Sequence, residues 1–373
     1  MLILLLVVAA LVGGALLVGA HLVQPSPLPT GRLGHLAYGL DGDIYVADWD
    51  GKNPTRISHA PPNGSTDCYG FGGEGPMWSP DGRHLAYRSG APFSGGGTVY
   101  ISDPAGHVVA SFPGTGWLVS WSPDSTRVVT SIDLGKTFGI YGLDGVRQAL
   151  LTVPLGYEVH GDYDPVWSPD GLSLLMPIAP ISPTSPSEVW KLPIDGGAPR
   201  RVPSEDPPSH RDAAYSSDGA RVAFIAYPDS SSLVIAKADG TELRVLVGAK
   251  SDPNYGPGQG AAYQNPIVSP TGDRVAFIWS PAVYDQTSDP SLSTYELRVV
   301  DVATGTVTTL ARASGAFPLD PIKFSPEGDR ILFSRTEAND VTSLWSFHVD
   351  GSDPQLLVTG TGWGDWQWQP AGP

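Results

Sequence analysis

Short apolar runs separated by turn residues recur along the chain after residue 31. Each has the length and half-buried pattern of a β-strand; examples are Leu85-Ala86-Tyr87, Val222-Ala223-Phe224, Val275-Ala276-Phe277 and Ile331-Leu332-Phe333. A second series of runs leads into Asp-Gly, a dipeptide favoured in tight hairpin turns, at Asp50-Gly51, Asp144-Gly145, Asp239-Gly240 and Asp350-Gly351. The pattern predicts an all-β chain of paired short strands.

A five-residue phrase precedes the first apolar run of each unit. Its copies begin at Trp78, Trp121, Trp167, Tyr215, Val268, Phe324 and Trp368, in steps of 43 to 56 residues. In the form Trp-Ser-Pro-Asp-Gly, an apolar residue ends a strand and Ser-Pro-Asp-Gly forms a tight turn. Each unit therefore contains four strands, and the period is that of a propeller blade.

The two ends of the chain complement each other. The first unit has strands at 35–38, 43–47 and 55–58 but lacks the strand that carries the phrase, whereas 364–370 has that strand alone. We therefore expect the C-terminal strand to complete the N-terminal blade, which gives seven blades in a closed ring without an exposed sheet edge. An open solenoid is the alternative.

The repeat resembles that of the TolB-like (PD40, WD40-like) β-propeller family, which carries the same W-S-P-D-G turn and the later Asp-Gly hairpin. The resemblance covers residues 32–372. Local departures are Ser125 for Gly, Ser217 for Pro, Thr271 and Glu327 for Asp, and Gln369 and Ala371 in the last copy. TolB itself has six blades and an additional N-terminal domain, so the resemblance is to the wider family. It implies a propeller on the extracytoplasmic side of a membrane.

Residues 1–23 differ in kind from the rest. Leu2 to Ala20 contains no charged residue, and a helix of this length, at about 1.5 Å per residue, crosses a bilayer. We interpret 1–23 as an N-terminal transmembrane anchor, with a cleaved signal segment and a secreted or periplasmic protein as the alternative. Residues 24–31 contain Pro25, Pro27 and Pro29 and are expected to form a stiff linker. The propeller then occupies 32–373.

The charge of the chain restricts its partners. The net charge is −16, opposite to that of a nucleic-acid-binding protein. An acidic propeller also repels anionic lipids, so the N-terminal segment has to supply the membrane contact. The single cysteine, Cys68, excludes an intrachain disulfide.

Candidate ligand-binding residues stand just before each copy of the phrase, where the innermost strand of a blade begins. They form an expected ring of mostly acidic or amide side chains around the channel mouth: Glu74, Trp117, Asp164, Asp212, Asn265, Asp320 and Asp365. One interpretation is that these side chains cap strands and bond to the backbone of neighbouring blades. The functional interpretation is an acidic funnel for a cationic or peptide ligand.

Long connections are expected on the same face as this ring. They join successive blades at 59–75, 154–164, 203–212 and 248–265, and second to third strands at 89–98, 178–188 and 279–294. They carry aromatic residues of the kind that binding surfaces favour: Tyr69, Phe71, Tyr157, Tyr163, Tyr255, Tyr263 and Tyr284. The opposite face has mostly tight turns, so function is expected on the long-loop face.

One cluster suggests a metal. His160, Asp162 and Asp164 alternate, so an extended chain points them the same way, and His210 and Asp212 hold the equivalent place in the next blade. Nitrogen and oxygen ligands of this kind suit a divalent metal. Strand capping is the alternative.

Enzymatic motifs are otherwise absent from the sequence, with no G-x-S-x-G elbow, P-loop, CxxC or HExxH. The sequence therefore favours a membrane-tethered propeller scaffold without catalysis or cofactor, which binds a protein or peptide partner. The alternative is a lactonase-like, metal-assisted hydrolase built on His160, Asp164, His210 and Asp212.

Overall fold

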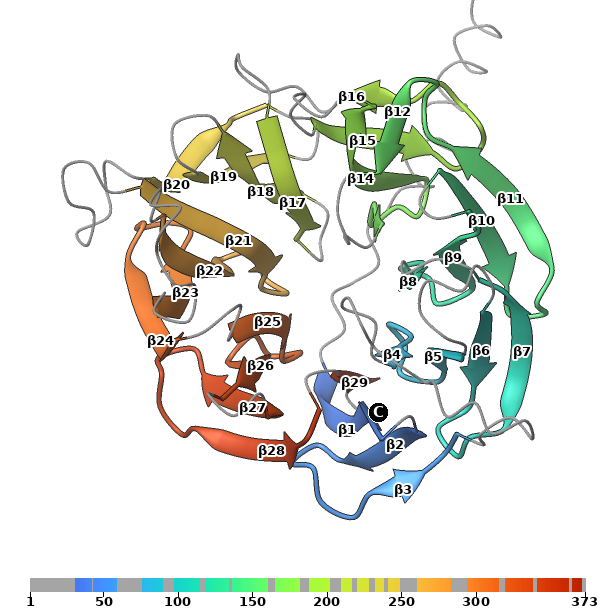
Figure 1. The fold of residues 1–373 in the computed structure, drawn as a ribbon, viewed down its shortest axis with the longest axis horizontal. Coiled ribbons are helices and arrows are strands. Elements are labelled where there is room, and N and C mark those ends of the chain that lie inside the picture. The colour runs from blue at the N-terminus through green and yellow to red at the C-terminus, as the bar shows by residue number, and fades with distance from the viewer. Residues whose placement is uncertain are drawn as a thin grey trace, which may run out of the picture.

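The computed structural model is a closed ring of seven β-sheets around a central axis (Figure 1). It describes residues 31–41, 43–58, 76–89, 97–114, 119–133, 136–159, 165–181, 188–201, 209–216, 220–227, 232–237, 241–248, 260–282, 294–314, 319–337, 341–361 and 364–370. Each sheet is one antiparallel blade, and the strand that leads into the repeated phrase lies nearest the axis. The predicted seven-bladed propeller is confirmed.

The strands of the first four blades are these. Blade 1 consists of β29 (Gly364–Pro370), β1 (Gly31–Leu40), β2 (Asp43–Asp48) and β3 (Thr55–Arg56). Blade 2 consists of β4 (Met77–Trp78), β5 (Leu85–Ser89), β6 (Thr98–Ser102) and β7 (Val108–Pro113). Blade 3 consists of β8 (Val119–Trp121), β9 (Arg127–Ser131), β10 (Thr137–Gly142) and β11 (Arg147–Thr152). Blade 4 consists of β12 (Tyr157–Val159), β13 (Val166–Trp167), β14 (Ser173–Pro180), β15 (Glu188–Pro193) and β16 (Arg200–Arg201).

The remaining three blades contain four strands each. Blade 5 consists of β17 (Ser209–Tyr215), β18 (Arg221–Tyr227), β19 (Ser232–Lys237) and β20 (Arg244–Gly248). Blade 6 consists of β21 (Gly260–Val268), β22 (Arg274–Ala282), β23 (Thr294–Asp301) and β24 (Val307–Ser314). Blade 7 consists of β25 (Leu319–Phe324), β26 (Arg330–Thr336), β27 (Thr342–His348) and β28 (Gln355–Thr359).

Blade 4 differs from the expected four strands because its inner strand is divided. Strand β14 pairs with β12 at one end, Tyr157 opposite Pro180, and with β13 at the other, Val166 opposite Leu175. At 8 residues, β14 is long enough to accommodate both short strands.

The ring is closed as the sequence predicts. Strand β29 pairs antiparallel with β1, from Gly31 opposite Pro370 to Tyr38 opposite Gly364. Trp366 is fully buried, and its indole Nε1 donates to the carbonyl of Trp49 at 3.1 Å. The C-terminal strand therefore forms the inner edge of the N-terminal blade.

Apolar cores lie between neighbouring blades, because successive residues of a strand point to opposite faces of the sheet. On β1, Leu36 packs with Leu332 and Leu344 of blade 7, whereas Ala37 packs with Trp78 of blade 2. The repeated Trp reaches the preceding blade. Nε1 of Trp121, for example, donates to the carbonyl of Met77 at 3.0 Å. The repeated Trp therefore connects one blade to the next.

The serine of the repeated phrase holds its own turn closed. Each such hydroxyl accepts from the backbone N–H five residues on, as Ser79 does from His84 at 2.9 Å and Ser325 from Arg330 at 3.0 Å. The serine also donates to an aspartate of the turn: Ser79 Oγ lies 2.6 Å from Asp81 Oδ1. The buried serine hydroxyl and the backbone N–H five residues on therefore both have hydrogen-bond partners.

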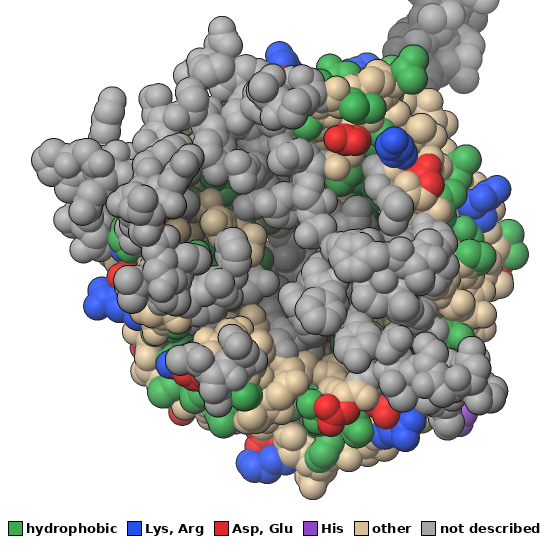
Figure 2. Space-filling view, in the orientation of Figure 1, with side chains coloured by type: hydrophobic (Ala, Val, Ile, Leu, Met, Phe, Trp, Pro, Cys, Tyr) green, Lys and Arg blue, Asp and Glu red, His purple; other side chains and the backbone are tan. Residues whose placement is uncertain are grey.

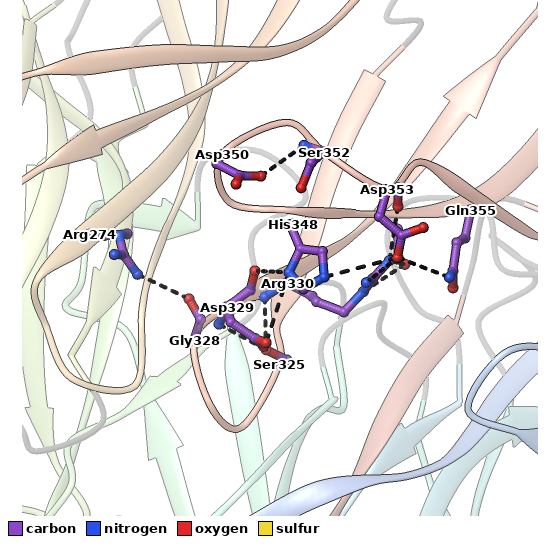
Figure 3. Close-up of polar contacts among 11 residues, drawn as sticks. Arg274, Ser325, Gly328, Asp329, Arg330, His348, Asp350, Ser352, Asp353 and Gln355 are labelled. Atoms are coloured by element: carbon purple, nitrogen blue, oxygen red, sulfur yellow. Dashed lines mark hydrogen bonds and ion pairs between the residues drawn. The ribbon is translucent and has the colours of Figure 1, made fainter.

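Two departures from the phrase are compensated within the turn. Where Thr271 and Glu327 replace the aspartate, an aspartate two residues later takes the serine hydrogen bond. Ser269 Oγ lies 2.8 Å from Asp273 Oδ1, and Ser325 Oγ lies 2.7 Å from Asp329 Oδ1. Figure 3 shows the second of these turns. The hydrogen bond from serine to aspartate is therefore kept although the sequence of the phrase has changed.

The same turn in blade 7 belongs to a larger polar cluster (Figure 3). Arg330 Nη1 donates to Asp353 Oδ2 at 2.8 Å, and its Nη2 donates to Ser346 Oγ at 2.9 Å. The hydrogen bond from Arg330 holds the pKa of Asp353 below its ordinary value. These side chains fasten two turns of one blade together.

Glycines of the second hairpin pack against the preceding blade. Gly51 has φ +81°, and a Cβ there would lie 2.9 Å from the carbonyl carbon of Leu357 on β28. A Cβ on Gly106 would likewise lie 2.8 Å from the carbonyl oxygen of Ile57. The turns of the second hairpins therefore also form contacts between blades.

The expected N-terminal helix lies outside the described residues, as does the linker up to Thr30. Within the part of the chain that the structure describes, no helix has the length and apolar character needed to span a bilayer.

Candidate functional site

The strand connections divide the propeller into two faces. The Ser-Pro-Asp-Gly and Asp-Gly turns close the hairpins on one face, which we call the turn face. The segments that join second to third strands, and one blade to the next, begin and end on the opposite face, which we call the long-loop face. Most of these segments lie outside the described residues. Their assignment to this face therefore rests on the described ends of the strands that they connect.

The structure describes the side chains of two residues of the predicted ring, Asn265 and Asp365. For Asp212 and Asp320 it gives the backbone, in β17 and β25. Glu74, Trp117 and Asp164 lie outside the described residues, so the ring as a whole stays a prediction.

Asp365 connects the inner strands of three blades. Its carboxylate is buried, and Oδ2 accepts from the backbone N–H of Trp78 on β4 at 2.8 Å. Oδ1 accepts from Lys323 Nζ on β25 at 2.7 Å. Both neighbours of blade 1 are thus tied to one side chain, as the strand-capping interpretation expects for this position.

We expect Asp365→Asn to destabilise the protein. The amide cannot neutralise Lys323, and a hydrogen bond to a charged group contributes about 1.5–3 kcal/mol. Urea unfolding of Asp365→Asn, Lys323→Met and the double variant measures the coupling between the two side chains. An unfolding midpoint of Asp365→Asn equal to that of the wild type would refute this structural role.

β-Bulges occur at two of the predicted ring positions. In β17, Arg211 pairs with Ile225 and Ala213 with Phe224, so Asp212 is an extra residue. In β21, the register shifts between Gln264 and Ile267, and Asn265 adopts a positive φ of 50°. Bulges change the direction of a side chain and are frequent beside functional sites. The hydrophobic pattern did not reveal them.

The proposed metal cluster falls mostly outside the described residues. His160, Asp162 and Asp164 lie there, and for His210 and Asp212 only the backbone of β17 is described. Among the side chains that the structure does describe, no three His, Cys, Asp or Glu lie together in a way that could hold a metal ion.

One predicted surface aromatic is buried. Tyr263 is 1% exposed, and its ring centroid lies 5.7 Å from that of Phe277. The prediction was wrong because β21 begins at Gly260, so that Tyr263 lies inside a strand, opposite Trp279, rather than in a connection.

An apolar and aromatic patch on the long-loop face of blade 4 was only partly foreseen. Leu155 is fully exposed and Ile181 is 58% exposed, and the Ile181 N–H donates to the carbonyl of Gly156 at 2.9 Å. The ring of Tyr157 meets that of Trp190 edge-on, with centroids 5.2 Å apart. We call these four side chains, of Leu155, Tyr157, Ile181 and Trp190, the blade 4 patch.

Charged groups border the blade 4 patch. Glu188 accepts from Trp190 Nε1 and from Arg201 Nη1, both at 3.0 Å. Figure 2 shows hydrophobic side chains beside acidic and basic ones over β12, β15 and β16. An apolar centre with Trp, Tyr and Arg and a charged border has the composition of a protein-binding surface.

The protein family that this chain matches has the same propeller fold. The model of the TolB beta propeller domain family, PD40, matches residues 35–259. An uncharacterised protein of Agrobacterium fabrum strain C58 is 26% identical over 276 residues, which cover 70% of this chain and 84% of that protein.

Solved structures share the architecture. TolB from Acinetobacter baumannii is 20% identical with a TM-score of 0.50, and the match covers 90% of this chain and 66% of that one. Oligogalacturonate lyase from Vibrio parahaemolyticus is 13% identical with a TM-score of 0.57, covering 88% and 86%. The propeller domain of the trilobed protease from Pyrococcus furiosus, described as having an open velcro topology, is 12% identical with a TM-score of 0.55, covering 85% and 86%. At these identities the likeness shows the fold alone.

Proposed function

Because the chain belongs to the TolB beta propeller domain family, we propose that it is a non-catalytic, membrane-tethered scaffold on the extracytoplasmic side. In this proposal it binds a protein or peptide partner through its long-loop face and acidic channel mouth. Residues 1–23 supply the tether, since they form an uncharged apolar stretch long enough to cross a bilayer. The alternative with a cleaved signal segment would leave the same propeller free in the extracytoplasmic space.

The blade 4 patch carries the proposal. The large apolar side chains of Leu155 and Ile181 are wholly or mostly exposed. Burial of this apolar surface against a partner would be favourable. Rigid aromatic groups lie beside them, and such groups dominate binding energy at protein interfaces. The turn face also exposes apolar side chains, such as that of Val146, but the serine and aspartate side chains around them bond to their own turns. The long-loop face is therefore better suited to a partner.

We expect Ile181→Asp to abolish capture of the partner. A charge placed at the centre of an apolar contact should cost at least about 2 kcal/mol, or roughly thirtyfold in affinity. Affinity capture of the intact protein from its native membrane, with quantitative mass spectrometry, compares the variant with the wild type.

The control is Val146→Asp, because Val146 is also 58% exposed but lies beside Gly145 on the turn face. Both variants should melt at the wild-type temperature, and Val146→Asp should retain the partner. Equal retention of the partner by the two variants would exclude the blade 4 patch from the interface.

A further inference from the structure

The position of Gly31 shows from which face of the propeller the N-terminal segment departs. Strand β1 is antiparallel to β2, and His35 lies opposite Asp48, so the Gly31 end of β1 is beside the end of β2 that leads into Asp50-Gly51. That hairpin belongs to the turn face. Gly31 also pairs with Pro370, the last residue of β29. The chain before residue 31 therefore joins the propeller on the turn face.

The attachment lies close to the propeller axis. Strand β1 is the second strand of its blade, next to the innermost strand β29, with β2 and β3 outside it (Figure 1). A linker that starts here has to cross two strands, about 10 Å, to reach the rim. It then has to pass along the height of the blade, about 20 Å for the 6 residues of β2, before it reaches the long-loop face.

The linker is too short for that path. Residues 24–31 span about 25 Å when extended, at about 3.1 Å per residue for a proline-rich segment. The path around the rim is about 30 Å, and the height of the blade alone, about 20 Å, would use most of the linker, so either path leaves too little for the distance to the bilayer. From this comparison, and resting on the tether of the proposed function, we infer that the turn face is held toward the membrane and that the long-loop face points away from it.

Because the net charge of the protein is −16, we expect no binding of the turn face itself to an anionic bilayer. Its hairpins repeatedly carry aspartates, as at Asp103 and Asp350, whose carboxylates accept hydrogen bonds from their own turns. Such a surface repels anionic headgroups. The orientation is therefore set by the point of attachment, and the partner of the blade 4 patch is one that approaches from the side away from the bilayer.

Fluorescence energy transfer tests the orientation. The full-length protein, with Cys68→Ser, carries a donor at Ala198→Cys in the β15–β16 hairpin or at Leu155→Cys, so both donors are on blade 4 but on opposite faces. The protein is reconstituted in phosphatidylcholine vesicles that contain a headgroup-labelled acceptor lipid. Transfer from position 198 should exceed transfer from position 155. Equal transfer, or greater transfer from 155, would overturn the inference.

Flotation of the same vesicles separates the two proposals. Protein that floats and shows the wrong order of transfer retains the tether but refutes the orientation. Protein that does not float refutes the tether and the orientation with it. Protein without residues 1–23 should neither float nor show transfer.

Discussion

Removal of residues 364–373 should unfold or aggregate the protein. The deletion takes away β29, the inner strand of blade 1, and leaves β1 as an unpaired edge. It also removes the buried indole of Trp366 and the Asp365 carboxylate that ties blades 2 and 7 together. Loss of one large buried aromatic alone costs about 3–5 kcal/mol, against a typical total stability of about 5–15 kcal/mol. Size-exclusion chromatography and thermal unfolding followed by circular dichroism measure the effect.

Two controls separate closure of the ring from loss of a side chain. Deletion of residues 371–373 should be tolerated, because the pairing of β29 with β1 ends at Pro370. Trp366→Ala should lower the melting temperature but leave the strand pairing in place. A monomeric ten-residue truncation with the wild-type melting temperature would contradict closure by β29.

Gly51→Ala should destabilise the protein far more than Gly196→Ala. Both glycines have a φ of +81°, so alanine carries the same backbone strain of about 1–2 kcal/mol at either position. Only at Gly51 does the new Cβ meet backbone, that of Leu357, whereas nothing lies within 4 Å at Gly196. Steric overlap in packed structure adds about 1–3 kcal/mol. Urea unfolding of the two variants measures the difference directly.

Gly196→Ala is the matched control, since it keeps the conformational penalty and removes the contact between blades. Equal losses in the two variants would mean that blade 7 moves aside to accept the methyl group. The close approach would then play no part in holding the seam of the ring.

The architecture could be predicted because the repeat determines it through local chemistry. Each of the six copies that carry the serine supplies a turn that closes on it, and the incomplete first and last units complete each other. Even the loss of aspartate at Thr271 and Glu327 leaves the turn intact, because Asp273 and Asp329 stand in.

Features that depend on one extra residue, or on two distant strands, could not be predicted. The bulges at Asp212 and Asn265 leave the hydrophobic pattern almost unchanged while they add a residue to the strand. The pairing of β12 with the far end of β14, which creates the blade 4 patch, joins segments whose sequences carry no sign of each other. The contact of Asp365 with Lys323 likewise depends on how neighbouring blades meet.

The antiparallel pairing of β1 has a mechanical consequence. Tension on the residues that precede Gly31 acts along the axis of β1, which is bonded to β29 on one side and to β2 on the other. Such a load shears both ladders at once instead of opening them one bond at a time like a zipper. Extraction of β1 would therefore require many hydrogen bonds to break together, so the point at which the chain is pulled is one where the ring resists force along the strand.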